Sequence, residues 1–152
     1  MIPVYDQAES QTYHAIDATV PVDEVPDARE LTGAGAIDFA QDHMPVSAEL
    51  MREARQDVDF TGIRIAVCLI LEPKTAVLLR QLKQAGAIVG AYCGSEANDE
   101  RVAAQLREED IPVAYNPDWT PEQAHQGALD LLDEIQPNII IDDGASFARL
   151  AA

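Results

Sequence analysis

The chain of 152 residues carries 27 aspartates and glutamates against 10 lysines and arginines, which gives a formal net charge of −17. So negative a surface argues against binding to nucleic acid or to an anionic membrane. The length suits one domain with its own core, and no apolar run approaches the roughly 20 residues of a membrane helix. We therefore expect one acidic domain, and place it in the cytoplasm because its first residues do not resemble an export signal.

Residues 1–31 predict an acidic arm that precedes the domain, which we assign to residues 32–152. The arm contains three prolines and shows little periodicity. A short strand is possible over residues 14–22, but Pro21 and Pro26 would limit it to the edge of a sheet.

Two helices are expected between residues 30 and 57, with a break at Pro45. The first places Ile37, Ala40 and Met44 on one side, and the second places Leu50, Met51 and Ala54 inward. Gly33 and Gly35 superficially suggest a dinucleotide-binding loop. We reject that motif because no strand is expected before them and Asp38 stands where the third glycine would be.

The central unit of the sequence is residues 61–82, which predict a strand, a short crossing and a helix. Seven consecutive apolar residues, 65–71, are typical of a strand buried on both faces. Pro73 suits the first turn of a helix, which carries Leu78, Leu79, Leu82 and Ala85 on one stripe. Ligands of open parallel sheets bind at the carboxyl ends of the strands, so we expect the residues just after this strand to border a site.

The rest of the chain alternates strands with helices. Strands are expected over residues 87–93, 111–115 and 138–141, and a helix over 98–109 that buries Val102, Ala103 and Leu106. A further helix begins with Thr120 as N-cap, Pro121 at the first position and Gln123 completing a capping box, and it ends before Pro137. The last strand runs into Asp142, Asp143 and Gly144.

This alternation predicts an α/β fold: a three-layer, Rossmann-like parallel sheet of about four strands with helices on both faces, preceded by the two N-terminal helices and the acidic arm. Cys68 and Cys93 each fall at or near the end of a strand and could be neighbours. Their separation in sequence excludes a CxxC motif, and buried, unreactive thiols are the favoured interpretation. The histidines form no cluster, so no metal site is expected.

Three segments together resemble the adenosylhomocysteinase family, also called S-adenosyl-L-homocysteine hydrolases. They are GAGAIDFAQDHMP, GIRIAVCLILEPKTAVL and NIIIDDGASF, which stand in the family's order and at its intervals. The resemblance covers residues 32–150, the first part of that family's substrate-binding domain. It implies the same Rossmann-like fold and, in the family, an enzyme that uses NAD to oxidise the ribose 3′-hydroxyl before homocysteine is eliminated.

The resemblance also implies a site at the strand ends. Asp143 matches a family carboxylate that contacts the substrate and assists proton transfer, and we take it as the catalytic candidate. Leu69, Glu72, Lys74 and Thr75 match positions that line the substrate site, where Glu72 and Lys74 lie near the purine. Read without the family, Asp142 and Asp143 could simply begin a turn with Gly144, and Glu72 and Lys74 could be ordinary residues at a helix N-terminus.

The sequence departs from the family's pattern at three places. Ile70 stands where the family has a histidine directly after Cys-Leu, and isoleucine cannot transfer a proton. Residues 93–100, CGSEANDE, keep the cysteine of a family loop but lose nearly all its polar residues. The family's NAD-binding domain lies beyond this chain, so we expect no cofactor bound by the chain and no activity of the chain alone.

Three functional hypotheses therefore stay open. The chain is the substrate-binding part of a hydrolase of this family, or an inactive nucleoside-binding or regulatory module derived from it, or a doubly wound domain that shares only the architecture. The expected ligand is a purine nucleoside or a molecule like S-adenosylhomocysteine. Because a short parallel sheet leaves exposed edges, we also expect a homo-oligomer or a partner that carries the cofactor domain.

Overall fold

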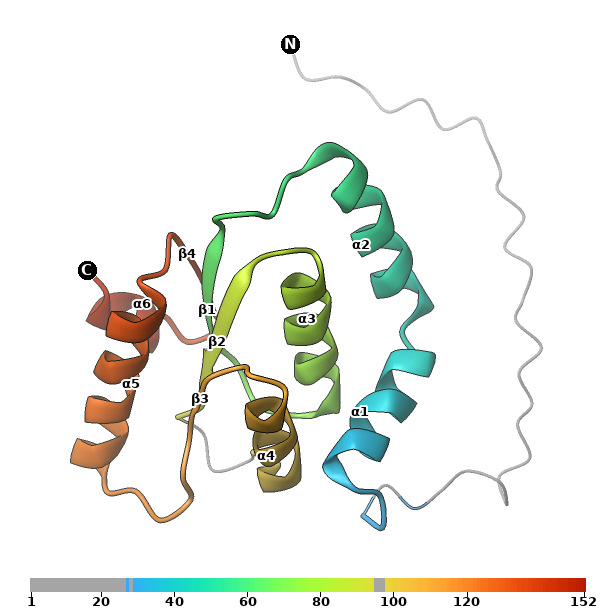
Figure 1. Ribbon diagram of the computed structural model, residues 1–152. Coiled ribbons are helices and arrows are strands. Elements are labelled where there is room, and N and C mark those ends of the chain that lie inside the picture. The colour runs from blue at the N-terminus through green and yellow to red at the C-terminus, as the bar shows by residue number, and fades with distance from the viewer. Residues whose placement is uncertain (1–26, 28, 95–97) are drawn as a thin grey trace, which may run out of the picture.

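The alternating strands form one parallel sheet in the computed structural model of the chain, which describes residues 27, 29–94 and 98–152. The strands are β1 (Arg64–Cys68), β2 (Ile88–Tyr92), β3 (Val113–Ala114) and β4 (Ile139–Asp142). They lie in the order β3-β2-β1-β4 (Figure 1). This confirms the expected Rossmann-like architecture.

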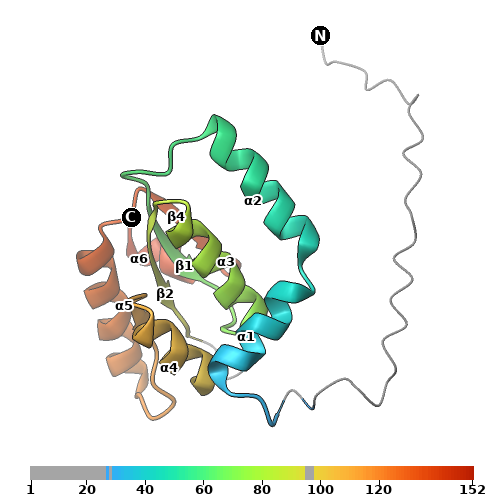
Figure 2. The same ribbon diagram turned by 45° about the vertical axis from the view of Figure 1, so that its right-hand side comes forward.

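Six helices are seen among the described residues. They are α1 (Gly33–Asp42), α2 (Pro45–Asp57), α3 (Pro73–Gln84), α4 (Glu100–Glu108), α5 (Pro121–Ile135) and α6 (Ser146–Leu150). Helices α3 and α4 cover one face of the sheet, α5 and α6 cover the other, and α1 packs outside α3 and α4 (Figures 1 and 2). Within the part of the chain that is described, no helix combines the length and the apolar character needed to cross a bilayer.

Two apolar cores result, one on each face of the sheet, because side chains alternate along a strand. Ile65 and Val67 of β1 face the core under α3 and α4, which also includes Ile37 of α1. Ala66 and Cys68 face the smaller core, which α5 and Phe147 of α6 complete. The two N-terminal helices precede the sheet, as expected. Of the two, only α1 has buried side chains.

Helix α5 carries the chain back across the sheet, and its start follows the sequence prediction. The Thr120 hydroxyl accepts a hydrogen bond from the Gln123 N–H, and the Gln123 side chain accepts one from the Thr120 N–H. Both bonds satisfy N–H groups that a helix leaves without partners in its first turn. Gln136, in the left-handed region at φ 46°, ends the helix just before Pro137.

The prediction for α2 is wrong at one residue. Leu50 was expected to face inward, but its side chain is 60% exposed. Met51 and Ala54 are half-buried as expected, and α2 contacts α3 alone among the sheet-covering helices. A helix that contacts only α1 and α3 and lies away from the sheet buries a narrow stripe. Leu50 lies outside this stripe with Val46, four residues earlier on the same exposed face.

Strands β1, β2 and β3 are shorter than the ranges predicted for them, whereas β4 keeps its predicted length of four residues. The run 65–71 yields a strand that ends at Cys68, and Ile70 is 46% exposed. The chain turns here because the Leu71 N–H donates to the Asn98 side chain at 2.7 Å, away from the sheet. The expected strand 111–115 is reduced to Val113 and Ala114. The possible strand over 14–22 and most of the acidic arm lie outside the described residues.

Gly33 has a packing role instead of the role in a dinucleotide loop that the sequence analysis rejected. It begins α1, and a Cβ atom placed on it would lie 2.1 Å from the Arg101 carbonyl oxygen of α4. Backbone of α1 therefore touches backbone of α4. A Cβ on Gly35 would meet its nearest neighbour, the Thr32 hydroxyl, at 3.3 Å.

This difference predicts opposite outcomes for two matched substitutions. Gly33→Ala should lower the free energy of unfolding by about 1–3 kcal/mol, because α1 must move away from α4. Gly35→Ala should leave stability within about 1 kcal/mol of the wild type, since alanine also favours the helix. Urea unfolding followed by circular dichroism measures both, and equal stability of the two variants would contradict the close contact.

Candidate functional site

The strand order locates the candidate site at the carboxyl ends of β1 and β4. The chain steps outward from β1 to β2 to β3 and then returns to the opposite side of β1. In open parallel sheets, a crevice forms where the strand order reverses in this way. Cys68, the last residue of β1, pairs with Asp142, the last residue of β4. The segments that follow these two residues therefore border the same crevice.

The pairing of β1 with β4 places the backbone of Asp143 at the end of β1. The Asp143 N–H donates to the Cys68 carbonyl at 3.4 Å, which holds Asp143 beside the end of β1. The Asp143 side chain is exposed and makes no hydrogen bond or ion pair within the described residues. Its carboxylate is consequently free to accept a hydrogen bond from a ligand. Ile70 follows Cys68 by two residues, and its apolar side chain is 46% exposed.

Asp142 has the structural role in a turn that the sequence analysis left open for both aspartates. Its carboxylate accepts backbone hydrogen bonds at 2.9 Å from Gly144, Phe147 and Ala148. Partial burial opposes the ionised form of Asp142, but these N–H groups outweigh that effect and hold its pKa below the usual range. Asp142 thus begins α6 and shapes the turn that exposes Asp143. The Asp-Asp-Gly sequence, typical of a turn, was the available signal.

The turn between β1 and α3 carries the other candidate residues. Glu72 and Lys74 form an ion pair at 3.4 Å, with side chains 46% and 65% exposed. Exposed pairs of this kind are worth about 0–1 kcal/mol, so a ligand can replace the contact at little cost. Glu72 makes no capping hydrogen bond at the start of α3. Leu69 is half-buried and packs against the larger core.

Thr75 and Asn98 hold the backbone of this turn in place. The Thr75 hydroxyl donates to the Ile70 carbonyl at 2.8 Å, so its proton is already committed within the chain. The Asn98 amide accepts from the Leu71 N–H, and the Asp99 N–H donates to the Leu71 carbonyl at 2.8 Å. These bonds join the turn after β1 to the start of α4. Asn98 was missed because its partners lie 27 residues away in sequence.

A hollow of about 590 Å³ also opens near the ends of β2 and β3. It is lined by Tyr92, Cys93, Gly94, Tyr115, Asn116, Pro117, Trp119, Pro121 and Ala124. None of the sequence-predicted site residues lines it. Those residues instead divide into Asp143 with Ile70 at the β1–β4 side, and Glu72, Lys74 and Thr75 around the start of α3.

The two cysteines are buried, and they form no disulfide among the described residues. Burial raises the pKa of the Cys93 thiol to about 12, and the neighbouring Cys68 adds to the increase. A thiol with so high a pKa carries almost no thiolate at neutral pH. This agrees with the expectation of unreactive cysteines.

The described residues offer no evident place for a metal or a dinucleotide. No three histidine, cysteine, aspartate or glutamate side chains within residues 27, 29–94 and 98–152 converge on a common point. The turn after β1 has no glycine and carries Glu72, whose charge opposes a pyrophosphate group. The glycines at 33 and 35 lie in α1, which packs on helices and follows none of the described strands.

Comparison with known proteins gives a consistent result. Residues 24–151 match the family model described as S-adenosyl-L-homocysteine hydrolase. The chain is 36% identical over 114 residues to an adenosylhomocysteinase of Thermoplasma acidophilum, covering 74% of this chain and 28% of that protein. It is 39% identical over 119 residues to an adenosylhomocysteinase of Pyrococcus abyssi, covering 78% and 28%. An S-inosyl-L-homocysteine hydrolase of Methanopyrus kandleri is 36% identical over 114 residues, covering 74% and 27%.

The two aspartates at the end of β4 should respond differently to substitution. Asp142→Ala should lower the free energy of unfolding at pH 7 by about 1–2 kcal/mol, as for the loss of a helix cap. Asp143→Ala should change it by less than about 0.5 kcal/mol, because that side chain is exposed. Chemical unfolding of both variants beside the wild type tests this, and equal losses would contradict the assignment.

The effect of Asp142→Ala should also depend on pH. The folded state lowers the pKa of Asp142, so its contribution to stability is complete above the ordinary aspartate pKa of about 4. The contribution disappears as the pH falls through the lowered folded-state pKa. The stability difference between wild type and variant should therefore shrink in acid, and a constant difference would exclude this role.

Proposed function

Because this chain belongs to the S-adenosyl-L-homocysteine hydrolase family, we propose that it is a substrate-binding part of such a hydrolase. Its ligand would be a purine nucleoside thioether, S-adenosyl-L-homocysteine or the inosine counterpart, bound at the ends of β1 and β4. The observation that carries the proposal is the exposed, unpaired Asp143 carboxylate beside the end of β1, at the reversal of strand order.

Asp143 is the proposed polar anchor of the ligand and the proposed site of proton transfer. An ionised carboxylate only accepts hydrogen bonds, and it accepts them strongly from hydroxyl groups such as those of a ribose. Leu69 would supply apolar contact near the same strand end. Glu72, Lys74 and Thr75 would border the purine, where the exposed ion pair offers both a donor and an acceptor. Adenine and hypoxanthine could both bind beside such a pair, and the titration below compares adenosine with inosine.

Ile70 supports a second candidate function, a nucleoside-binding or regulatory module without catalytic activity. The family's histidine would stand at this position, and a positioned acid–base group is typically worth 10²–10⁴ in rate. An isoleucine that is 46% exposed supplies surface for binding but no proton. Binding at this edge is common to both candidates, and only turnover separates them.

Turnover would also require a dinucleotide-binding domain beyond the described residues. The described residues do not fit a dinucleotide, so the oxidation at the ribose needs a cofactor domain held elsewhere, such as one on a second chain. The matched relatives are more than three times as long as the segment aligned here, since the chain covers 28% of the first two. A homo-oligomer would cover exposed surface but would supply no dinucleotide loop of the kind that the described residues lack.

Calorimetric titration tests the proposed binding. The purified chain is titrated with adenosine, inosine and S-adenosyl-L-homocysteine, and at least one should bind. Asp143→Ala should weaken that binding by about 10–150-fold, the equivalent of a charged hydrogen bond worth about 1.5–3 kcal/mol. Asp133→Ala, an exposed aspartate of α5, is the matched control and should bind normally. No heat with any of the three ligands would refute the proposal.

Activity assays test the second half of the argument. The isolated chain with added NAD should not cleave S-adenosyl-L-homocysteine, because Ile70 cannot transfer a proton and no dinucleotide site is built from the described residues. Release of homocysteine is measured with a thiol reagent, with a full-length adenosylhomocysteinase as the positive control. Cleavage above background by the isolated chain would show that this reasoning is wrong.

A further inference from the structure

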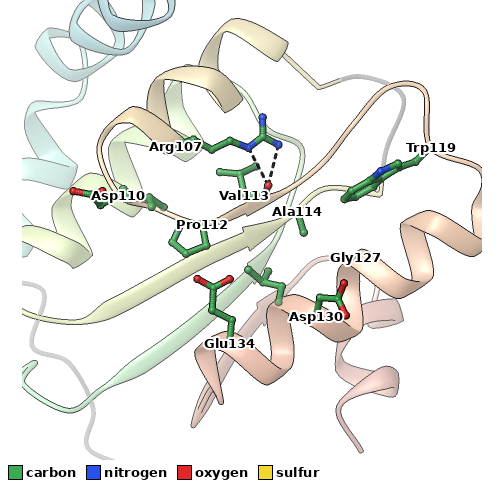
Figure 3. A pocket seen from close by; sticks show the side chains of 11 residues that line it. Arg107, Asp110, Pro112, Val113, Ala114, Trp119, Gly127, Asp130 and Glu134 are labelled. Atoms are coloured by element: carbon green, nitrogen blue, oxygen red, sulfur yellow. Dashed lines mark hydrogen bonds between the residues drawn. The ribbon is translucent and has the colours of Figure 1, made fainter.

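A groove lies along the β3 edge of the sheet (Figure 3). None of the residues of the candidate nucleoside site lines it. It runs between the end of α4, strand β3 and helix α5, and has a volume of about 530 Å³. Val113, Ala114 and Leu131 give it an apolar floor, and Trp119 forms a wall at one end. It is an open groove and not an enclosed cavity, unlike sites that surround most of a small ligand.

The position of the Trp119 ring depends on a glycine. A Cβ atom on Gly127 would lie 2.6 Å from the ring, so the indole rests directly on the backbone of α5. Gly127 is followed on the same side of the helix by Asp130, Leu131 and Glu134, at spacings of three, four and seven residues. The aromatic face and two carboxylates therefore line one side of the groove.

The charges around the groove are mainly negative. Asp110, Asp130 and Glu134 are carboxylates, and Arg107 is the only basic residue in the lining. The Arg107 guanidinium donates to the carbonyls of Val113 at 2.9 Å and of Tyr115 at 2.5 Å. Among the described residues, no salt bridge engages any of the three carboxylates. The groove thus combines an aromatic surface with unneutralised negative charge, the combination that attracts a cation.

Arg107 also limits the ways in which a partner can bind. Its hydrogen bonds occupy carbonyl groups of Val113 and Tyr115 at the edge of the sheet, the acceptors that an added strand would need. A partner here must therefore insert side chains and cannot extend the sheet. The open shape suits an extended chain, and the negative lining selects basic side chains.

We propose that this groove is a docking site for a basic polypeptide segment, with an arginine side chain lying against Trp119 and paired with Asp130 and Glu134. The planar guanidinium stacks on an aromatic face and pairs with carboxylates at the same time. This proposal does not depend on nucleoside binding, because the groove shares none of its lining residues with the candidate nucleoside site.

Trp119 is the single tryptophan of the chain, so its fluorescence reports on binding in this groove. It also lines the hollow near the ends of β2 and β3, and the variants below therefore locate the bound peptide. The full chain is titrated with a hexa-arginine peptide at about 150 mM salt, an ionic strength at which distant charges are screened. A saturable change in Trp119 emission is expected. Absence of a saturable change up to millimolar peptide would overturn the proposal.

Two double variants with the same net charge separate docking from general attraction to an acidic protein. Asp130→Asn with Glu134→Gln should weaken binding by about tenfold or more, because both paired carboxylates are lost. Glu122→Gln with Asp133→Asn changes the same helix at exposed residues outside the groove and should bind within about twofold of the wild type. Equal weakening in both would mean non-specific attraction and overturn the site.

Two further measurements test the ring and the class of ligand. Gly127→Ala displaces Trp119 without changing any charge and should also weaken the peptide, and unchanged affinity would overturn the role of the ring. Spermine serves as a small, flexible polycation that lacks a planar group. If it bound as tightly as hexa-arginine, a polyamine would replace the polypeptide as the occupant, and the proposal would be wrong.

Discussion

The return of the chain to the far side of β1 is the constraint on which the candidate site depends. Helix α5 makes this return, and it does so close to the sheet because Gly90 has no side chain. A Cβ atom on Gly90 would lie 2.9 Å from Ile135 of α5. With α5 in that position, β4 pairs with β1, and the Asp143 N–H donates to the carbonyl of Cys68 at the end of β1. Without the return, the two segments would lie on opposite margins of the sheet.

The two edge strands of the sheet, β3 and β4, differ in how their outer edges are covered. On the β3 side, Arg107 binds the exposed carbonyl groups of the strand, which prevents further pairing and gives the groove its single basic residue. On the β4 side no described side chain has this role, and Ile139 remains 45% exposed. Ile139 and Ile141 of β4 point to the same face of the sheet as Ile65 and Val67 of β1. Helix α3 covers β1 and β2 on this face, so β4 is less covered there. The β3 edge is thus covered by the Arg107 side chain, whereas the β4 edge exposes an apolar side chain.

Most of the fold follows from local patterns in the sequence. The capping residues of α5, the proline at the start of α3 and the apolar runs of β1 and β4 act over a few residues, and all are visible without a structure. Leu50 and the end of β1 were not predictable in this way. Burial of Leu50 depends on how many neighbours α2 has. The chain leaves the sheet after β1, and the Leu71 N–H donates to the side chain of Asn98. Contacts between residues far apart in sequence decide such details.

The same distinction applies to the candidate site. The resemblance to a known family indicated Asp143 and its neighbours, but the division of labour between Asp142 and Asp143 needed coordinates, because both residues follow the same strand. Asp142 is committed to three backbone N–H groups, and this commitment turns Asp143 outward as an unpaired carboxylate. An acceptor without a donor beside it can hold a ligand hydroxyl, but Ile70 leaves that acceptor without the neighbouring acid that proton transfer would use. In both proposed functions Asp143 would accept a hydrogen bond from the ligand, and the two differ in whether proton transfer follows.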